Sequence, residues 1–478
     1  MMIADQSRKM LLGGKWVEKE EKINVFDPQD NRLITTVPKA GKEDMLLAIK
    51  TAEEGREIAK QMSVHERINV LNRAADYMEQ YHVVYAEMIA KEGSKTINEA
   101  RGEVTRAIQT IRISAEEARR IKGETIPFDQ MPGSENRIGY YYKFPIGIIA
   151  AITPFNDPLN LVAHKIGPAI ASGNAIIVKP ATLTPVSALL LAEAFVEAGL
   201  PDKILSVITG SGSEIGDTLI THPSINMVSF TGGLDTGESI AKKAGLKKLS
   251  MELGSNSPTI ILKDADIDAA VDGCVSGAYG AVGQNCIGVQ RIFIEKPVYN
   301  QFVDQFVEQT KRVRMGNKQD EATDMGPLIA EKEAIRVEEI VNEAVEYDGV
   351  TVLTGGYRDG AYYAPTVLSD VVPGAKIAQE EIFGPVVMVF PVDDIDEAIE
   401  KSNAVDYGLQ AGIFTNNVSH AFKAVERLDY GGVMVNDTSD YRIDGMPFGG
   451  TKGSGIGREG VKYTIEEMTD PKIVQFKL

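Results

Sequence analysis

The stretch ILSVITGSGSEIGDTLI, residues 204–220, places an apolar run, a glycine-rich turn and a helical pattern one after another. We expect residues 204–208 to form a strand and residues 212–221 a helix. Backbone N–H groups at the start of such a helix can bind a pyrophosphate. Gly212 and Gly216 belong to a Gly-x-Gly-x-x-x-Gly run, which differs from the usual dinucleotide fingerprint. Alone, this turn is weak support for a nucleotide site, and a purely structural turn is the alternative.

The same alternation of strands and helices continues on both sides of this stretch. Short apolar runs predict strands at 146–151, 175–178, 227–230, 259–262, 289–295 and 386–391. Helical patterns occupy 160–172, 185–199, 266–281, 298–313 and 395–402. Residues 42–123 are rich in charged residues and alanine, and they predict helices interrupted near Gly93 and Gly102. This alternation is typical of an α/β fold in which helices cover both faces of a parallel sheet.

Composition limits the classes of protein to consider. A chain of 478 residues has room for two or three domains, and its net charge of −18 argues against a nucleic-acid partner. We expect no membrane span, leader sequence or metal site, because no long apolar window and no basic start followed by an apolar run occur. The two cysteines, Cys274 and Cys286, predict free thiols and a cytoplasmic location. Cys274 stands in an apolar helical pattern and is expected to be an inert core residue.

One cysteine and one glutamate stand in runs that suit acyl chemistry. Cys286 lies in GQNCIGVQR, which ends at Arg291, and Glu252 lies upstream in MELGS. A reactive thiolate needs space and nearby N–H groups or positive charge, and Gly283 and Gly288 provide the space. A carboxylate from another segment can activate water against an acyl group held on the sulfur. We therefore predict two-step acyl chemistry, and we expect Arg291 to form a structural ion pair.

These two runs resemble the signatures of the aldehyde dehydrogenase superfamily. The Gly-Gln-x-Cys setting of Cys286 and the Glu-Leu-Gly run that starts at Glu252 carry the resemblance. Further matching runs are ITPFN at 152–156, KP at 179–180, SFTG at 229–232, EIFGP at 381–385 and PFGG at 447–450. Their common order and spacing are not expected by chance, so the chain is identified as a member of this family.

The resemblance implies a fold, a domain division and an assembly. It implies a Rossmann-like NAD(P)-binding domain, a second α/β catalytic domain and a small antiparallel oligomerisation sheet. The first domain would comprise residues 1–123 and 146–253, and the catalytic domain residues 254–453. Segments 124–145 and 464–478, which have alternating apolar residues, would pair and join subunits. A homodimer or homotetramer is therefore expected.

The resemblance also assigns roles to individual residues. Cys286 would attack the aldehyde, the Asn156 amide would help to stabilise the oxyanion, and Glu252 would activate water. Lys179 and Glu381 would hold the two riboses of NAD(P). The other expected cofactor contacts are Ile152, Thr153, Pro154, Phe155, Ala181, Thr182, Gly212, Gly216, Phe230, Thr231, Gly232, Leu253, Gly254 and Phe383. The plainer alternatives are a turn residue for Asn156 and a strand end for Lys179.

Thr182 bears on the choice between NADP and NAD. Relatives that prefer NAD often carry a glutamate three residues after the lysine, where it repels a 2′-phosphate. A neutral Thr182 beside Lys179 removes this repulsion and leaves a positive partner. We therefore place NADP slightly ahead of NAD, with use of both as an alternative.

Four polar residues fall at positions that the resemblance places along the aldehyde tunnel. Arg106, His164 and Arg442 stand where relatives acting on apolar aldehydes have apolar side chains, and Asn160 shares a helical face with His164. Arginine binds carboxylates and phosphates through two parallel hydrogen bonds. We predict a small polar or anionic aldehyde, with lactaldehyde, succinate semialdehyde, glyceraldehyde-3-phosphate, phosphonoacetaldehyde and sulfolactaldehyde as candidates. An exposed Arg106 and a core His164 are the alternatives.

Two other functions remain to be compared with this one. A coenzyme-A-acylating relative would pass the thioester to a thiol and would usually lack the water-activating glutamate. A non-catalytic nucleotide-binding descendant would be expected to lose Cys286, Glu252 or Asn156, and all three are present. Both observations favour the hydrolytic dehydrogenase.

Overall fold

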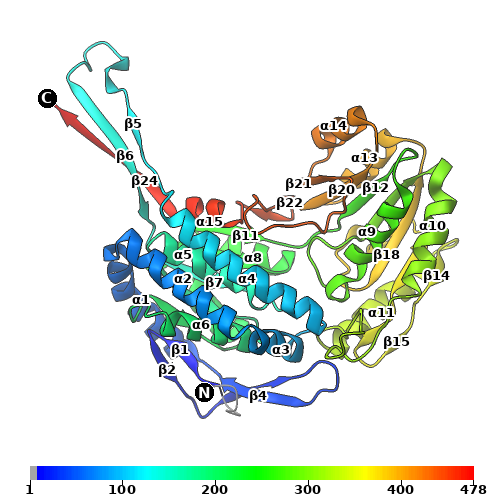
Figure 1. Ribbon diagram of the computed structural model, residues 1–478, viewed down its shortest axis with the longest axis horizontal. Helices are drawn as coiled ribbons and strands as arrows, with labels where there is room; N and C mark the ends of the chain where they lie inside the picture. The colour runs from blue at the N-terminus through cyan, green and yellow to red at the C-terminus, as the bar shows by residue number, and fades with distance from the viewer. Residues whose placement is uncertain (1–7) are drawn as a thin grey trace.

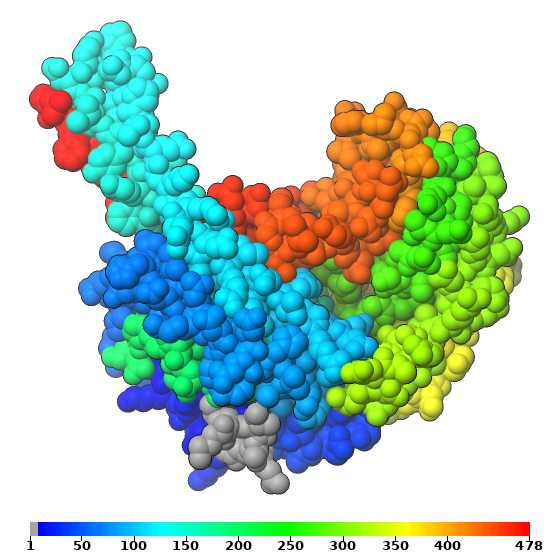
Figure 2. Space-filling model, viewed as in Figure 1, coloured from blue at the N-terminus to red at the C-terminus, as the bar shows by residue number. Residues whose placement is uncertain are grey.

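The computed structural model describes residues 8–478 and has two lobes and a projecting arm (Figure 1). Residues 1–7, which we assigned to the cofactor-binding part, lie outside the described residues. In Figure 2 the arm projects away from both lobes. None of the helices within residues 8–478 is long and apolar enough to cross a membrane.

The first lobe contains an eight-stranded sheet in the order β2-β1-β9-β8-β7-β10-β11-β23. Its five central strands are parallel, and the chain order reverses beside β7. In open α/β sheets, ligands bind outside the carboxyl ends of strands at such a reversal. The strands are β1 (Met10–Leu12), β2 (Lys15–Val17), β7 (Ile148–Ile152), β8 (Ala175–Lys179), β9 (Leu205–Val207), β10 (Met227–Thr231), β11 (Lys248–Glu252) and β23 (Gly455–Ile456).

Alternate residues of β7 face two separate cores. Ile149 and Ala151 pack with one set of helices, while Ile148 and Ala150 pack with the other. The first set is α2 (Val64–Gln80), α3 (His82–Glu92), α4 (Ile97–Ala118), α5 (Asn160–Ala171), α6 (Val186–Glu197) and α15 (Val461–Glu467). The second set is α1 (Lys42–Gln61), α7 (Gly212–Thr221) and α8 (Leu234–Ala244). The predicted strands and helices of this region are therefore confirmed.

One predicted helix interruption is wrong. The break near Gly93 occurs between α3 and α4, but Gly102 lies within α4. Val104 and Ala107, downstream of Gly102, are fully buried and continue the helical spacing of Ala100. Their burial outweighs the roughly 1 kcal/mol by which glycine disfavours a helix relative to alanine.

The second lobe contains a seven-stranded sheet in the order β14-β17-β18-β13-β12-β20-β21. Its strands are β12 (Pro258–Ile261), β13 (Arg291–Glu295), β14 (Thr351–Thr354), β17 (Thr366–Ser369), β18 (Val386–Val392), β20 (Gln410–Phe414) and β21 (Gly432–Val435). One face packs on α9 (Ile267–Tyr279), α10 (Lys296–Thr310), α11 (Glu331–Val345) and α12 (Lys376–Gln379). The other packs on α13 (Ile395–Asn403) and α14 (Val418–Arg427). The second predicted α/β unit is therefore present.

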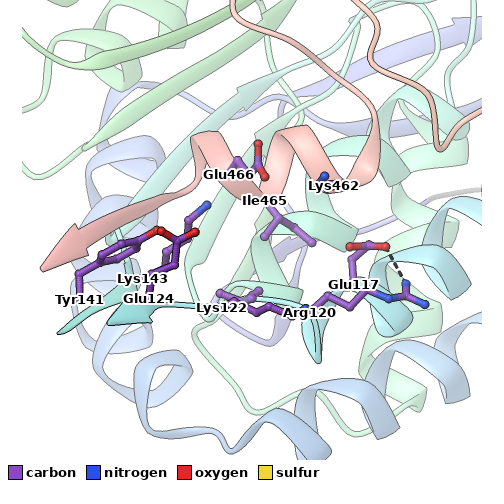
Figure 3. A pocket seen from close by; sticks show the side chains of 10 residues that line it. Glu117, Arg120, Lys122, Glu124, Tyr141, Lys143, Lys462, Ile465 and Glu466 are labelled. Carbon is purple, nitrogen blue, oxygen red and sulfur yellow. Dashed lines mark hydrogen bonds and ion pairs between the residues drawn. The ribbon is translucent and has the colours of Figure 1, made fainter. Parts of the chain in front are cut away.

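The arm is a three-stranded antiparallel sheet of β5 (Glu124–Ile126), β6 (Arg137–Pro145) and β24 (Thr469–Lys477) (Figure 1). At its root a cavity of about 580 Å³ lies between the end of α4, β6 and α15, where Glu117 and Arg120 form an ion pair (Figure 3). The remaining elements are β3 (Lys22–Phe26) with β4 (Leu33–Pro38), β15 (Arg358–Asp359) with β16 (Tyr362–Tyr363), β19 (Tyr407–Gly408) with β22 (Thr451–Lys452), and the short helices η1 (Phe128–Gln130) and η2 (Gly280–Gly283).

The predicted fold class is confirmed as α/β with two sheets and a small antiparallel sheet. The division into a cofactor-binding and a catalytic domain, and the role of the arm in assembly, stay predictions.

Candidate active site

Cys286 follows a turn of unusual backbone conformation. Residues Ala281, Val282 and Gly283 have φ of 49°, 62° and 65°, in the left-handed region. The N–H of Ala281 donates to Glu99 Oε1 at 2.7 Å. This contact joins the turn in the second lobe to α4 in the first.

The predicted nucleophile and oxyanion donor line one cavity of about 290 Å³. Cys286, Asn156, Arg106 and Arg442 all contribute to its wall. The other charged side chains of the wall are Lys95, Glu99, Glu103, Asp157 and Asp440. Asn160 and His164 are fully buried and are not part of this wall, so the structure brings together two of the four predicted substrate residues at the cavity surface.

The two thiols have different surroundings, and both are free. Cys286 is partly buried and packs against Ile287, Leu409 and Phe448. Burial raises the pKa of Cys286 to about 12, and the Arg442 guanidinium is the main group that opposes this shift. Cys274 is fully buried in α9, which confirms that it is a core residue, and burial raises its pKa further.

Glu252 ends β11 and is buried without a hydrogen-bond partner for either carboxylate oxygen among the described residues. Burial, and next the charge of Glu459, raise the pKa of Glu252 well above its ordinary value. Arg442 and Lys165 oppose that shift. A buried carboxyl group with a raised pKa can exchange protons near neutral pH, as a general base requires.

Glu459 is the charged neighbour of Glu252, and sequence reasoning missed it. Its carboxylate accepts from Lys165 Nζ at 3.0 Å and from an Arg442 terminal nitrogen at 2.8 Å. Burial raises the pKa of Glu459, but Lys165, His164 and Arg442 lower it by more, so the net shift is downward. The cations therefore favour the ionised form of Glu459, and Glu252, whose oxygens have no hydrogen-bond partner among the described residues, is the member of the pair with the raised pKa.

Asp444, also missed, connects three of the predicted substrate residues. One carboxylate oxygen of Asp444 accepts from Asn160 Nδ2 at 3.0 Å and lies 2.9 Å from His164 Nε2. Arg106 donates to the same carboxylate from Nε at 3.3 Å and from a terminal nitrogen at 2.8 Å. Burial acts to raise the pKa of Asp444, but the opposing effects of His164 and Arg106 together are larger, so the net shift is downward. Burial also lowers the pKa of His164, which favours the neutral imidazole. The Arg106 guanidinium is always charged, so its charge keeps the Asp444 carboxylate ionised.

Arg442 occupies the junction between this network and the cavity. Its guanidinium carbon lies 3.7 Å from the Phe448 ring centroid, and a terminal nitrogen lies 3.4 Å from His164 Nε2. The expected ion pair of Arg291 is wrong. Arg291 donates instead to the carbonyl oxygens of Asn256, Lys401 and Ser402 and to a tyrosine hydroxyl, which satisfy its donors without a counter-charge.

The predicted adenosine contacts meet at the ends of β8 and β9. Lys179 Nζ donates to Pro180 O at 2.9 Å and lies 3.5 Å from Thr182 Oγ1, and burial lowers the Lys179 pKa to about 8. Thr182 in turn donates to Gly210 O at 3.3 Å. A Cβ added to Gly212 would lie 3.9 Å from Lys179 Cε. Thus Lys179, Thr182 and the glycine-rich turn lie together at the start of α7, and the cofactor contacts of Ala181, Thr182, Gly212 and Gly216 stay predictions.

A second group of the predicted cofactor contacts lies at or beside the ends of β7, β10 and β11. The hydroxyls of Thr153 and Thr231 are buried without partners among the described residues. The rings of Phe155 and Phe383 stand perpendicular with centroids 5.8 Å apart. Ile152 and Pro154 flank Thr153, while Phe230, Gly232, Leu253 and Gly254 surround the end of β11.

Glu381 faces this same edge. A Cβ on Gly254 would lie 2.4 Å from Glu381 Oε2, and Glu381 Oε1 accepts the Ser255 N–H at 2.9 Å. Burial raises the Glu381 pKa to about 7. The unpartnered hydroxyls and the open space beside Gly216 at the start of α7 fit a dinucleotide bound along this edge.

Comparison with known proteins defines the family. A sequence model of the aldehyde dehydrogenase family matches residues 16–474. The chain therefore belongs to the aldehyde dehydrogenase family, and it is an NAD(P)-dependent aldehyde dehydrogenase.

Two relatives and two solved structures are similar over nearly the whole chain. The 3-sulfolactaldehyde dehydrogenase of Priestia aryabhattai is 47% identical, with 98% of each chain covered. Aspartate-semialdehyde dehydrogenase 1 of Pseudomonas canavaninivorans is 46% identical, covering 95% of this chain and 96% of that one. Aldehyde dehydrogenase 21 of Physcomitrella patens, solved with the reaction product succinate, has a TM-score of 0.97 at 38% identity and 99% coverage of both chains. The NADP-dependent glyceraldehyde-3-phosphate dehydrogenase of Bacillus halodurans, solved with NADP, has a TM-score of 0.96 at 38% identity, covering 99% of this chain and all of that one.

Proposed function

We propose that this enzyme oxidises a short aldehyde with an anionic group to its carboxylate, and that 3-sulfolactaldehyde is the first substrate to test. One observation carries the proposal: Cys286, Asn156 and Arg442 line a single cavity, and Glu252 lies near enough to shift the Cys286 pKa. Lactaldehyde, succinate semialdehyde, glyceraldehyde-3-phosphate and phosphonoacetaldehyde are the other candidates. Water and NAD(P)⁺ are the co-reactants, and the products are the carboxylate, NAD(P)H and two protons.

The first step forms a bond between Cys286 Sγ and the aldehyde carbon. A thiolate is the nucleophile, and burial keeps the pKa of the Cys286 thiol near 12, so the thiol gives its proton to water when the bond forms. This is one of the two protons released. The Asn156 amide and the backbone N–H of Cys286 stabilise the oxyanion of the thiohemiacetal. NAD(P)⁺, held by residues such as Lys179 and Glu381, supplies the hydride acceptor when bound. Cys286 then carries the acyl group as a thioester.

In the second step Glu252 takes a proton from water, and the hydroxide attacks the thioester carbon. The C–S bond breaks, the carboxylate leaves and Cys286 is restored. Acyl transfer to a thiol such as coenzyme A would not need this base. The buried, unpartnered carboxylate of Glu252 therefore supports hydrolysis.

The anionic part of the substrate has two candidate partners. Arg442 binds Glu459 through one terminal nitrogen, whereas Arg106 already donates from two nitrogens to Asp444. A guanidinium has five N–H donors, so both arginines, and Arg442 most of all, keep donors for a sulfonate, phosphate or carboxylate. The names of the relatives, which include 3-sulfolactaldehyde, aspartate semialdehyde and the product succinate, agree with an anionic substrate.

A panel of neutral and anionic aldehydes, run with NADP and with NAD, tests the proposal. We expect burst release of reduced nicotinamide and a carboxylate product, with the highest kcat/KM for an anionic aldehyde. Equal kcat/KM for propanal and 3-sulfolactaldehyde would exclude the anionic preference. An enzyme that binds NADP but oxidises none of the aldehydes would exclude the proposed catalytic role.

A conservative variant tests the Arg106 contact without leaving the buried Asp444 carboxylate with no cation beside it. Arg106→Lys keeps a charge near Asp444 but loses the planar fork, and it should raise KM for the anionic aldehyde about tenfold with little change for propanal. Arg112→Lys on the same helix is the matched control, because Arg112 pairs with Asp76 and Glu79 away from the cavity. Equal effects of both variants on both aldehydes would contradict substrate binding by Arg106.

We also propose that the arm joins two copies into a homodimer or homotetramer. Ile138, Tyr142, Ile473 and Phe476 on β6 and β24 are each about half exposed or more, at 56%, 53%, 64% and 48%. Apolar surface of this kind favours an interface. Ile473→Asp should shift sedimentation toward a monomer, whereas Ile335→Asp on α11, 37% exposed, should not. An unchanged assembly with Ile473→Asp would point to another interface.

A further inference from the structure

Four carboxylates line the active-site cavity, and three of them already have ionic or backbone partners. Glu99 accepts the N–H groups of Ala281 and Thr96. Glu103 accepts from Lys95 Nζ and from the N–H groups of Leu159 and Asn160, and Asp157 pairs with Lys95 and lies 3.6 Å from Arg106. Asp440 is different, because among residues 8–478 its carboxylate accepts only from Asn285 Nδ2.

Asp440 lines the same cavity as Cys286, which carries the reactive sulfur. Its partner Asn285 directly precedes Cys286, and Asp440 and Arg442 both line the cavity. Burial raises the Asp440 pKa to about 7, with Arg106 opposing the shift, so the carboxylate is not held ionised by a salt bridge. The cavity thus has a hydrogen-bond acceptor on Asp440, held by the residue before Cys286, and guanidinium donors on Arg442 and Arg106.

We infer that Asp440 accepts a hydrogen bond from a hydroxyl or ammonium group on the first or second carbon after the aldehyde carbon (C2 or C3). This inference rests on the proposed function, in which Cys286 binds the aldehyde carbon and Arg442 binds the anionic end. The substrate class becomes narrower: a short aldehyde with an anion at one end and a hydroxyl or amino group close to the carbonyl. A donor-free aldehyde would leave Asp440 without that partner.

A pair of aldehydes that differ by one hydroxyl tests this assignment. We compare 3-sulfolactaldehyde with 3-sulfopropanal, using Asp440→Ala, the isosteric Asp440→Asn and the control Asp437→Asn, which alters a nearby carboxylate that is not part of the cavity wall. The wild type should favour the hydroxylated aldehyde by about tenfold to a hundredfold in kcat/KM. Asp440→Ala should remove this preference, because it should lower kcat/KM for 3-sulfolactaldehyde more than for 3-sulfopropanal, and Asp437→Asn should keep it.

The outcomes separate this inference from the proposed function. Equal losses for both aldehydes in Asp440→Ala and Asp440→Asn, at unchanged melting temperature, would overturn the role of Asp440. A wild type without hydroxyl preference would overturn it as well. If neither sulfonated aldehyde is oxidised while a neutral one is, the proposed anionic substrate fails, and comparing lactaldehyde with propanal still tests the contact of Asp440.

The geometry also points to Glu99 as a positioning residue for Cys286. Ala281 and Val282 are non-glycine residues with φ of 49° and 62°, a conformation that costs energy and needs support from its surroundings. Glu99 supplies that support, because its Oε1 accepts the Ala281 N–H at 2.7 Å while its Oε2 accepts the Thr96 N–H at 2.7 Å and so caps α4. One carboxylate therefore ties the first lobe to the turn that precedes Cys286.

A matched pair of variants separates this role from helix capping. Ser63 and Glu66 form the same capping box on α2, and Glu66 has no contact with the turn. In Glu99→Gln the amide has one carbonyl oxygen, so it can accept from only one of the two N–H groups. This variant should lower kcat at least about tenfold, whereas Glu66→Gln should leave kcat within about twofold.

The alkylation rate of Cys286 by iodoacetamide gives a second readout that does not depend on turnover. Cys274 is fully buried, so the reaction reports on Cys286. We expect Glu99→Gln to change the alkylation rate at least about threefold, and Glu66→Gln to leave it unchanged despite a comparable fall in melting temperature. Equal kcat and equal alkylation in the two variants would overturn the role of Glu99, while the nucleophile itself is tested by substituting Cys286.

Discussion

The two sides of the active site are built from different interactions. The proposed cofactor side, at and beside the carboxyl ends of β7 to β11, consists mainly of backbone groups, glycines, hydroxyls and the rings of Phe155 and Phe383, with Lys179 and Glu381 as its charged side chains. The proposed substrate side is a network of charges, in which Arg106 pairs with Asp444, and Arg442 and Lys165 pair with Glu459. A ligand on the first side meets none of these ion pairs, whereas an anion on the second side must bind the arginine donors that the pairs with Asp444 and Glu459 leave free.

This difference sets the size of the effects to expect. A typical neutral hydrogen bond contributes about 0.5 to 1.5 kcal/mol, whereas removal of one member of a buried ion pair costs about 3 to 5 kcal/mol. Each substitution on the cofactor side should therefore change the affinity for NAD(P) by only a small amount. Those on the substrate side should change stability and activity together, and the largest losses should come from Cys286 and Glu252, where the two sides meet.

The largest expected effect belongs to Cys286→Ser, which keeps the side-chain volume but replaces the nucleophile. A hydroxyl in this surrounding does not ionise, so kcat should fall by at least about 10³-fold, measured with any aldehyde that the wild type oxidises. Cys274→Ala is the control: it should cost about 1 to 2 kcal/mol of stability through a small core cavity and keep the kcat. Full turnover in Cys286→Ser would mean that the sulfur does not carry the acyl group.

Glu252→Gln should give the next largest loss and separate the two chemical steps. The amide cannot take a proton from water, so steady-state turnover should fall about 10² to 10⁴-fold while the burst of reduced nicotinamide remains. Rapid mixing followed by mass spectrometry should show an acyl adduct on Cys286. If burst and steady state fall equally, Glu252 acts before the thioester forms, in removing the thiol proton.

The contrast between the two sides also explains what could be predicted from the sequence. The cofactor side depends on short local runs, such as the turn at Gly212 and the ITPFN run, each directly after a strand. Local patterns of this kind show both the strand and the group at its end, so a parallel sheet could be predicted, whereas the order β9-β8-β7-β10-β11 comes from the structure. Gly102 was misread because an isolated glycine weakens a helical pattern without ending it.

The substrate side could not be predicted in the same way, because its partners are far apart in the chain. Arg106 and Asp444 are separated by 338 residues, and Lys165 and Glu459 by 294. No local pattern distinguishes a buried carboxylate of this kind from an exposed one. Arginines at tunnel positions indicated positive charge, and only the folded structure shows that Asp444 and Glu459 already neutralise much of it. Buried cations require such partners, so the presence of counter-charges could have been expected, though not their identity.

Glu459→Gln tests whether the substrate side behaves as a linked ionic network. It leaves Lys165 and Arg442 without their counter-charge, and it should cost about 3 to 5 kcal/mol, seen as a lower melting temperature. Because the folded-state pKa of Glu459 is lowered, its pairing stabilises the protein above the unfolded pKa of about 4.3 and is lost as pH falls. The wild type should therefore lose melting temperature more steeply below about pH 5 than Glu459→Gln does. Parallel curves would show that the pair adds no net stability.

The smallest expected effect lies on the cofactor side, with Thr182→Glu. A carboxylate at this position would pair with Lys179, whose Nζ lies 3.5 Å from Thr182 Oγ1, and would repel a 2′-phosphate. We expect KM for NADP to rise about tenfold to a hundredfold, KM for NAD to change little, and the ranking of aldehydes to stay the same. Thr221→Glu, at the exposed far end of α7, is the matched control for added negative charge. If Thr182→Glu altered the ranking of aldehydes, the cofactor side and the substrate side would be coupled. The contrast between a side made of backbone groups and a side made of charges would then be wrong.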